Sequence, residues 1–222
     1  MNDFYQVSKK FGTDKVEYHG YHFFYPHFFD FLRNQKFKMV EIGLGGGGSL
    51  NAFQEYFPLA DITVMDINKE AYLSERSRII KGDQSKLEDL DKLIQTVQSA
   101  ELIIDDGSHN PLHQFDTFTY LFKNLLKPGG VYIIEDIEAS YWHPESTLYG
   151  YKSGYFNLID GFKKFQEMIN SEFTGIDNHL DISTVTYGQN CIIITKRTIE
   201  EKGYFDRTYR FSNSLKQISS YG

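Results

Sequence analysis

The sequence has a single cysteine, Cys191, so no disulfide bond can form within the chain. The apolar residues that follow it, 192–194, predict that it lies in a buried strand. This cysteine usage is typical of a reducing compartment. The sequence also shows no signal peptide and no apolar run of transmembrane length. We therefore expect a cytoplasmic protein without a membrane partner.

Positive charge is also scarce, because 23 Lys and Arg residues stand against 30 Asp and Glu residues, a formal net charge of −7. A nucleic-acid surface needs a basic stripe, so we expect no nucleic-acid partner. No internal repeat or low-complexity tract is present. With 222 residues, 41% hydrophobic and 24% charged, the chain is long enough for one well-buried globular core.

Short apolar segments alternate with segments of helical periodicity, which predicts an α/β fold with a doubly wound, mostly parallel, Rossmann-like sheet. We expect seven strands, the last two forming an antiparallel C-terminal hairpin: 38–42, 61–65, 78–80, 102–104, 131–134, 179–187 and 189–196. The predicted helices of this domain are 50–56, 69–76, 87–98, 112–126 and 155–170. The expected organisation is an N-terminal helical cap (1–37), the main domain (38–197) and a C-terminal tail (198–222).

Acidic residues follow two neighbouring predicted strands. Asp105 and Asp106 end one strand, Glu135 and Asp136 end the next, and His109 follows Asp106 by three positions. Ligands bind beyond the carboxyl ends of such strands, so we expect these side chains in one crevice. Crowded carboxylates repel one another and favour a hard cation with oxygen ligands. The alternative is that they are helix caps at a solvated strand end, but the pattern occurs twice and includes a histidine.

A glycine-rich loop follows the first strand and admits two interpretations. Gly43, Gly45 and Gly48 match the G-x-G-x-x-G dinucleotide pattern, and Asp66 lies at the distance expected of a ribose-binding acid. An NAD-dependent oxidoreductase acting on a sugar or small molecule is therefore an alternative. However, Glu41 lies two residues before the loop, where it would repel a pyrophosphate but is compatible with a cationic cofactor.

The acid-led loop, Glu-x-Gly-x-Gly-x-Gly over 41–47, resembles the first motif of class I S-adenosylmethionine (SAM) methyltransferases. That resemblance implies that Asp66 binds the SAM ribose and that Asp83, with Gln84 beside it, lies near the adenine. Asp105 either contacts the cofactor or orients the metal shell. The expected cofactor-binding residues are Glu41, Gly43, Gly45, Ser49, Asp66, Asp83, Gln84 and Asp105.

The Asp-Gly-Ser-His segment at 106–109 and the later Glu-Asp pair resemble the metal-dependent O-methyltransferases. With 12–15 (Gly-Thr-Asp-Lys) and 82–85 (Gly-Asp-Gln-Ser), the sequence is similar to bacterial sugar O-methyltransferases of the macrolide-glycoside type, which are related to proteins labelled cephalosporin hydroxylase. The resemblance runs from about residue 11 to 142. It implies that Asp106, Glu135 and Asp136 bind Mg²⁺ and that His109 is the general base.

The function expected from these patterns is SAM- and Mg²⁺-dependent O-methylation of a sugar hydroxyl, in a pathway that makes a polysaccharide or a natural product. The partner is a nucleotide-linked sugar or a glycosylated metabolite. The sequence shows no large N-terminal extension such as some antibiotic-pathway relatives carry, and it leaves the acceptor and a homo-oligomer open. It also leaves open whether Tyr141 and Trp142 stack on a sugar or pack internally, and whether Lys15, His19 and Tyr21 close over a ligand or form a structural cap.

A sugar hydroxyl is too weak an acid to react unaided at neutral pH, and a metal ion that lowers its pKa, together with a histidine base, would meet that need. Two further alternatives are a non-catalytic SAM- or metal-binding module and an iron-dependent hydroxylase. Iron would require histidine and carboxylate ligands in a facial set, whereas three carboxylates favour Mg²⁺.

Overall fold

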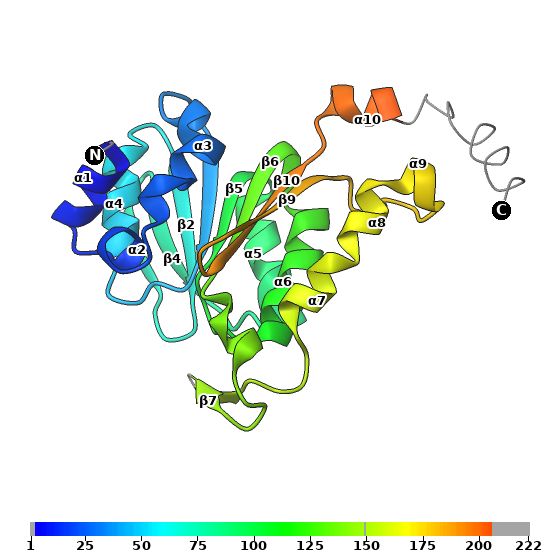
Figure 1. Ribbon diagram of the computed structural model, residues 1–222. Coiled ribbons are helices and arrows are strands. Elements are labelled where there is room, and N and C mark those ends of the chain that lie inside the picture. The colour runs from blue at the N-terminus through cyan, green and yellow to red at the C-terminus, as the bar shows by residue number, and fades with distance from the viewer. Residues whose placement is uncertain (1–2, 149, 206–222) are drawn as a thin grey trace, which may run out of the picture.

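The computed structural model describes residues 3–148 and 150–205. It contains a sheet of eight strands in these residues, with helices on both faces (Figure 1). The strand order is β3-β4-β2-β1-β5-β6-β10-β9. The strands are β1 (Lys38–Ile42), β2 (Asp61–Asp66), β3 (Ala71–Ser74), β4 (Ser77–Lys81), β5 (Ala100–Asp105), β6 (Leu126–Glu135), β9 (Ile182–Gly188) and β10 (Cys191–Lys196).

The centre of the sheet is parallel and its two edges are antiparallel. Strands β4, β2, β1, β5 and β6 run parallel to one another, whereas β10 pairs antiparallel with both β6 and β9. This confirms the predicted α/β fold and its antiparallel C-terminal hairpin. The carboxyl ends of β1, β2, β5 and β6 therefore lie side by side at one end of the strands, where ligands bind in such folds.

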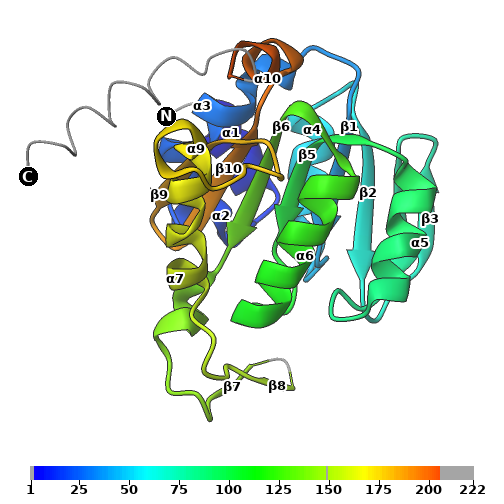
Figure 2. The ribbon, with the colours of Figure 1, turned by 90° about the vertical axis from the view of Figure 1, so that its right-hand side faces the viewer.

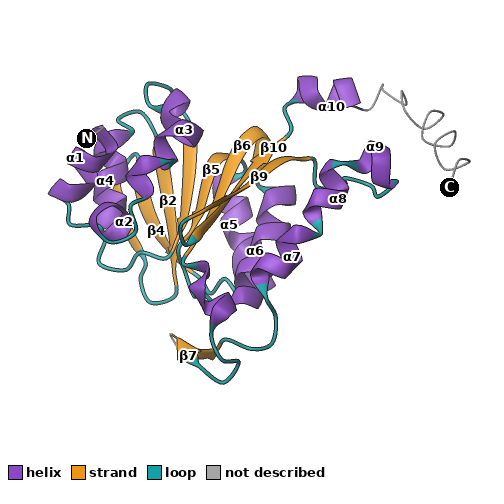
Figure 3. Ribbon diagram, in the orientation of Figure 1, coloured by secondary structure: helices purple, strands orange, loops and turns teal. Residues whose placement is uncertain are grey.

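The helices form two layers (Figure 3). One layer contains α1 (Asp3–Lys10), α2 (Asp14–Glu17), α3 (Tyr25–Phe29) and α4 (Gly48–Tyr56). The other contains α5 (Leu87–Val97), α6 (Pro111–Asn124), α7 (Leu158–Lys163) and α8 (Phe165–Ile169). Short elements complete the chain: η1 (Tyr21–Phe23), η2 (Asp30–Leu32), η3 (Ile137–Tyr141), β7 (Thr147–Leu148), β8 (Tyr151–Lys152), α9 (Ser171–Thr174) and α10 (Ile199–Phe205).

Two hydrophobic cores result, one on each face of the sheet. Successive side chains of a strand point to opposite faces, so Ile103 of β5 packs in one core while Leu102 and Ile104 pack in the other. All three are fully buried, as is usual where helices cover both faces of a parallel sheet. The continuous apolar runs of these strands reflect that double burial.

Residues 69–76, predicted to be helical, instead contain the edge strand β3. It pairs antiparallel with β4, so the sheet has eight strands in the described part of the chain rather than the predicted seven. Pairing with the exposed edge of β4 decides the conformation of this short polar segment, a tertiary effect that local periodicity does not report. The helix predicted for 155–170 is likewise two helices, α7 and α8, separated at Lys164.

The N-terminal helices pack directly on the sheet through an aromatic cluster. Phe4 of α1, Phe29 of α3 and Phe53 of α4 contact one another and belong to the core on that face. The division into a cap, a main domain and a tail stays a prediction. Of the predicted tail, residues 206–222 lie outside the described residues.

The hairpin formed by β7 and β8 extends beyond the carboxyl ends of the strands, below the sheet in Figure 2. It lies in the stretch that the sequence predicts to be an aromatic substrate loop. Within 3–148 and 150–205, no helix combines the length and the apolar character that crossing a membrane requires.

The single thiol provides a test of the core. Cys191 is fully buried in β10, and burial raises the pKa of its thiol to about 12. Because the thiolate is the reactive form, only about one molecule in 10⁴ carries it at pH 8. We expect slow modification by a thiol reagent in the native protein and fast modification in urea, followed by absorbance. Fast stoichiometric labelling under native conditions would contradict the described packing of β10.

Candidate functional site

The glycine-rich loop lies at the carboxyl end of β1 and contacts the end of β5. Gly43 has a φ of +90°, and a Cβ atom there would overlap the carbonyl oxygen of Asp106. The Asp106 N–H donates to the carbonyl of Ile42 at 2.9 Å, which fixes the two strand ends side by side. Only glycine satisfies both the backbone conformation and the close approach.

A cavity of about 630 Å³ extends from this loop along the carboxyl ends of the strands. Its lining contains most of the residues predicted to bind a cofactor, namely Gly43, Gly45, Ser49, Asp66, Asp83 and Gln84. It also contains three of the four residues predicted for metal binding and catalysis, namely Asp106, His109 and Asp136. Sequence reasoning therefore found the correct end of the sheet.

Asp66 stands at the end of β2 and connects two loops. Its Oδ2 accepts a hydrogen bond from the N–H of Leu44 at 3.1 Å, and its Oδ1 accepts from the N–H groups of Asn68 and Lys69. An ionised carboxylate offers about four acceptor positions, so Asp66 can still accept a ligand hydroxyl.

Asp83 lines the cavity and contacts the β7–β8 hairpin. Burial opposes its ionisation, but hydrogen bonds from the hydroxyl and backbone N–H of Ser85 outweigh it, so the pKa of Asp83 is lowered. Tyr151 of β8 also lines the cavity, and its hydroxyl donates to the Asp83 carboxylate at 3.4 Å. The hairpin is thus connected to the cavity by Tyr151, whereas Tyr141 and Trp142 are not among the lining residues.

Gln84 connects the loop after β4 with the loop after β5. Its side-chain nitrogen donates to both oxygens of Asp105, and its Oε1 accepts from the N–H of Ser108 at 2.6 Å. Asp105 is fully buried and is not part of the cavity lining. Burial raises the pKa of Asp105 to about 7. In this structure Asp105 therefore positions Gln84.

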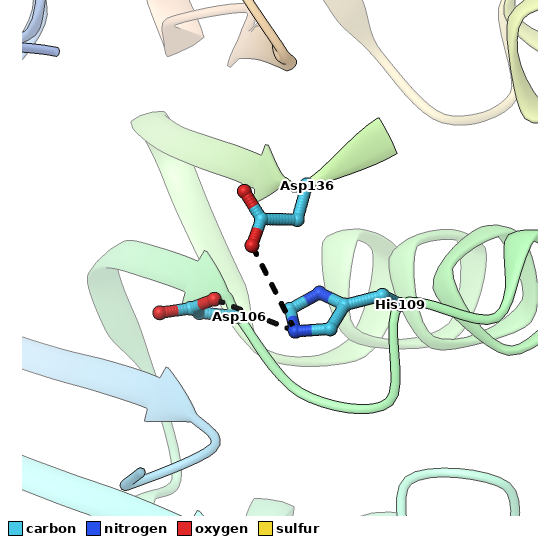
Figure 4. A group of neighbouring side chains, drawn as sticks. All are labelled: Asp106, His109 and Asp136. Atoms are coloured by element: carbon cyan, nitrogen blue, oxygen red, sulfur yellow. Dashed lines mark ion pairs between the residues drawn. The ribbon is translucent and has the colours of Figure 1, made fainter. Parts of the chain in front are cut away.

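The side chains of Asp106, His109 and Asp136 point toward one another (Figure 4), and all three residues line the cavity. The Nε2 of His109 lies 3.9 Å from an oxygen of each aspartate. One ligand atom from each of the three residues lies within 4.8 Å of the others. Two carboxylates and an imidazole at this spacing are a suitable donor set for a divalent cation.

Two of these residues adopt a strained backbone conformation. His109 has a φ of 52° and Asp136 a φ of 53°, in the left-handed region that side chains rarely adopt. Such strain costs of order 1–3 kcal/mol and persists where the surrounding structure enforces it, often at functional sites. Here it turns both side chains from the strand ends toward Asp106.

A buried lysine supplies positive charge beside this group. Lys15 of α2 is 1% exposed, and its Nζ lies 2.7 Å from Oδ2 of Asp106 and 2.6 Å from Oε2 of Glu135. Oε1 of Glu41 lies 3.9 Å from the same nitrogen. Neither Glu41 nor Glu135 is among the cavity-lining residues, so these two predicted site residues lie beside Lys15 rather than in the cavity wall.

Burial dominates the ionisation of this cluster. It raises the pKa of Glu41 to about 7 and that of Glu135 well above its ordinary value, and in both cases the charge of Lys15 opposes the shift. Burial would lower the pKa of Lys15, but the charges of Asp106, Glu135 and Glu41 raise it well above its ordinary value. The lysine therefore stays charged.

Asp136 is held by Tyr21 and His19, which the sequence left open between closing over a ligand and forming a structural cap, and by Asn190, which the sequence did not single out. The Tyr21 hydroxyl donates to its Oδ1 at 3.2 Å, and the side-chain nitrogen of Asn190 donates to the same oxygen at 2.9 Å. His19 Nε2 lies 3.5 Å away from this oxygen. Asn190 lies between β9 and β10, next to the residue paired with Glu135, a position evident only once strand register is known.

No protein-family profile matches the chain. It is similar to the mycinamicin VI 2''-O-methyltransferase of Micromonospora griseorubida, with 36% identity over 151 residues, and to the 8-demethyl-8-alpha-L-rhamnosyl tetracenomycin-C 2'-O-methyltransferase of Streptomyces olivaceus, with 35% identity over 144 residues. These matches cover 63% and 61% of this chain, but only 37% and 38% of the two relatives.

The fold is also similar to that of the MycE methyltransferase from the mycinamycin biosynthetic pathway in complex with Mg and SAH. The TM-score is 0.77 at 28% identity, over 100% of this chain and 60% of that chain. The chain is a homologue of bacterial sugar O-methyltransferases. The resemblance of its motifs to that family is confirmed, and the comparisons give the NAD-dependent alternative no support.

The contact between the glycine loop and the end of β5 can be tested with a matched pair of variants. We expect Gly43→Ala to lower the free energy of unfolding by about 1–3 kcal/mol or more, because it forces a strained φ and a clash with Asp106. Gly46→Ala is the control, since a Cβ atom there meets nothing within 4 Å. Urea unfolding of both variants provides the measurement, and equal losses would contradict the described contact.

Proposed function

We propose that the chain is a SAM- and Mg²⁺-dependent O-methyltransferase that acts on a hydroxyl of a sugar carried by a nucleotide or by a glycosylated small molecule. The observation that carries the proposal is the group of Asp106, His109 and Asp136 in the lining of a cavity that a glycine loop also lines. The relatives named above support it, since they are O-methyltransferases of glycosides. Because the matches cover less than two fifths of those proteins, the activity and acceptor are proposals.

The donor set fits the proposed metal. Mg²⁺ prefers oxygen ligands and few protein carboxylates, and Asp106 and Asp136 both direct carboxylate oxygens into the cavity. Glu135, the third proposed ligand, adjoins Asp136 and shares Lys15 with Asp106. We assign Asp106, Glu135 and Asp136 as ligands of the metal ion. We assign His109 as the base that accepts the hydroxyl proton.

The cavity fits the proposed cofactor. Its volume of about 630 Å³ lies in the range of small-molecule sites. Asp66 retains acceptor capacity for ribose hydroxyls. We assign Asp83, with Gln84 beside it, to the adenine end. Gly43, Gly45 and Ser49 line the same cavity. When ionised, the buried Glu41 behind the loop favours a cationic ligand over a pyrophosphate.

Each residue then has a defined task. When bound, SAM supplies the methyl group and Mg²⁺ supplies positive charge that lowers the pKa of an acceptor hydroxyl. His109 accepts the hydroxyl proton at Nε2, which faces both Asp106 and Asp136. Tyr21 and Asn190 hold Asp136 in its strained conformation, and Gln84 fixes the loop that carries His109 by accepting from Ser108 N–H.

Calorimetry separates the two cofactor hypotheses. We expect the full chain to bind SAM and not NAD, because Glu41 and the acidic cluster oppose a pyrophosphate. Each ligand is titrated with Mg²⁺ present and again with EDTA. Binding of NAD with no response to SAM would refute the proposed activity and would require a new explanation of the acidic cluster.

Substitutions in the cluster test the metal and base assignments. We expect Asp136→Asn to abolish Mg²⁺ binding and Mg²⁺-dependent methylation of a panel of glycosides and sugar nucleotides, while SAM still binds. His109→Ala should lower the methylation rate by about 10²–10⁴-fold, the usual contribution of a general base.

The exposed residues Asp116 and His27 provide matched controls. Asp116→Asn and His27→Ala should retain both Mg²⁺ binding and activity. If Asp136→Asn binds Mg²⁺ and turns over as well as its control, the metal assignment is wrong. If His109→Ala retains the full rate, the base assignment is wrong.

A further inference from the structure

Lys15 occupies an unusual position for a lysine, since its ammonium group is buried where three strands of the sheet converge. Asp106 follows β5, Glu135 ends β6 and Glu41 lies in β1, and all three acids face the one nitrogen. Two of its three contacts, at 2.7 and 2.6 Å, are charge-assisted hydrogen bonds at their optimal length. The third, to Glu41, is longer and is electrostatic in character.

The two carboxylates hydrogen-bonded by Lys15 are two of the three proposed metal ligands. Oδ2 of Asp106 and Oε2 of Glu135 each accept a hydrogen bond from the ammonium group. A divalent cation bound through the same carboxylates shares their negative charge with the ammonium group and also experiences the repulsion of a unit positive charge a few ångströms away.

We propose that Lys15 is a positioning residue that competes with the metal ion for Asp106 and Glu135. It holds both carboxylates directed toward one point, and metal binding draws at least one of them away from the ammonium group. This inference rests on the proposed metal dependence. It adds that the ammonium group of Lys15 lowers the affinity of the site for the metal ion.

The segment that carries Lys15 also forms part of the cavity. Gly12, Thr13 and Asp14 line it, and the carbonyl of Phe11 lies against the first residue of α4, Gly48. Further along the same segment, His19 and Tyr21 approach Asp136. One N-terminal segment thus contacts all three proposed ligands and the cofactor cavity, so competition at Lys15 connects metal binding with the contacts of this segment.

The experiment measures Mg²⁺ affinity by calorimetry and thermal unfolding in EDTA and in Mg²⁺, using the full chain. We expect Lys15→Met to bind Mg²⁺ at least about tenfold more tightly than wild type, because competitor and repulsion are both removed. In EDTA, Lys15→Met should unfold at a lower temperature than wild type. Mg²⁺ should raise the unfolding temperature of Lys15→Met more than it raises that of wild type. Lys9→Met, which removes the exposed ion pair with Glu17, is the control and should change neither quantity.

A charge-balanced variant separates competition for oxygens from general electrostatics. Lys15→Met combined with Glu41→Gln removes one charge of each sign but leaves Asp106 and Glu135 intact. We expect it also to bind Mg²⁺ more tightly than wild type. A return to wild-type affinity would overturn the proposed competition, and so would unchanged or weaker binding by Lys15→Met. If Lys15→Met alone does not fold, the Mg²⁺ affinity of this double variant tests the proposal.

The same titration distinguishes failure of this inference from failure of the proposed function. A wild-type protein that binds no Mg²⁺, with or without SAM, would overturn both. If wild type binds Mg²⁺ and neither lysine variant binds it more tightly, the role of Lys15 is overturned, whereas the proposed function is not.

Discussion

The structure depends on how it accommodates negative charge at the carboxyl ends of its parallel strands. Glu41 and Glu135 are buried, and Asp106 and Asp136 are close to them at the same edge of the sheet. Removing carboxylates from water is costly unless a partner compensates them. The ammonium group of Lys15 is that partner, so the acidic cluster and the N-terminal segment that carries the lysine stabilise each other.

This pairing explains how elements distant in sequence build one site. The lysine brings the N-terminal segment against the sheet, where Gly12 to Asp14 complete the cavity wall. The same segment then places Tyr21 on Asp136, while Asn190, between β9 and β10, donates to the same oxygen of that aspartate. Asp136 can therefore be held in a strained conformation that points it toward His109.

Much of the fold could be predicted because buried parallel strands have a strong local signature. Every predicted strand exists, and the short apolar runs end where the acidic residues begin. The edge strand β3 was not predicted, because its conformation depends on pairing with β4 rather than on its own periodicity. The break between α7 and α8 was missed for a related reason, since packing rather than sequence pattern divides that helix at Lys164.

By itself the sequence determined which strand ends carry glycines, acids and a histidine, because residue type and position along a strand are local properties. It thereby determined the edge of the sheet at which the site forms. Only the tertiary structure decided which of those acids face the cavity and which face a buried cation. Asp136 lines the cavity, Asp106 lines it and also contacts Lys15, and Glu41 and Glu135 lie beside Lys15 outside the cavity wall. That partition depends on strand register and long-range packing, which no local pattern encodes.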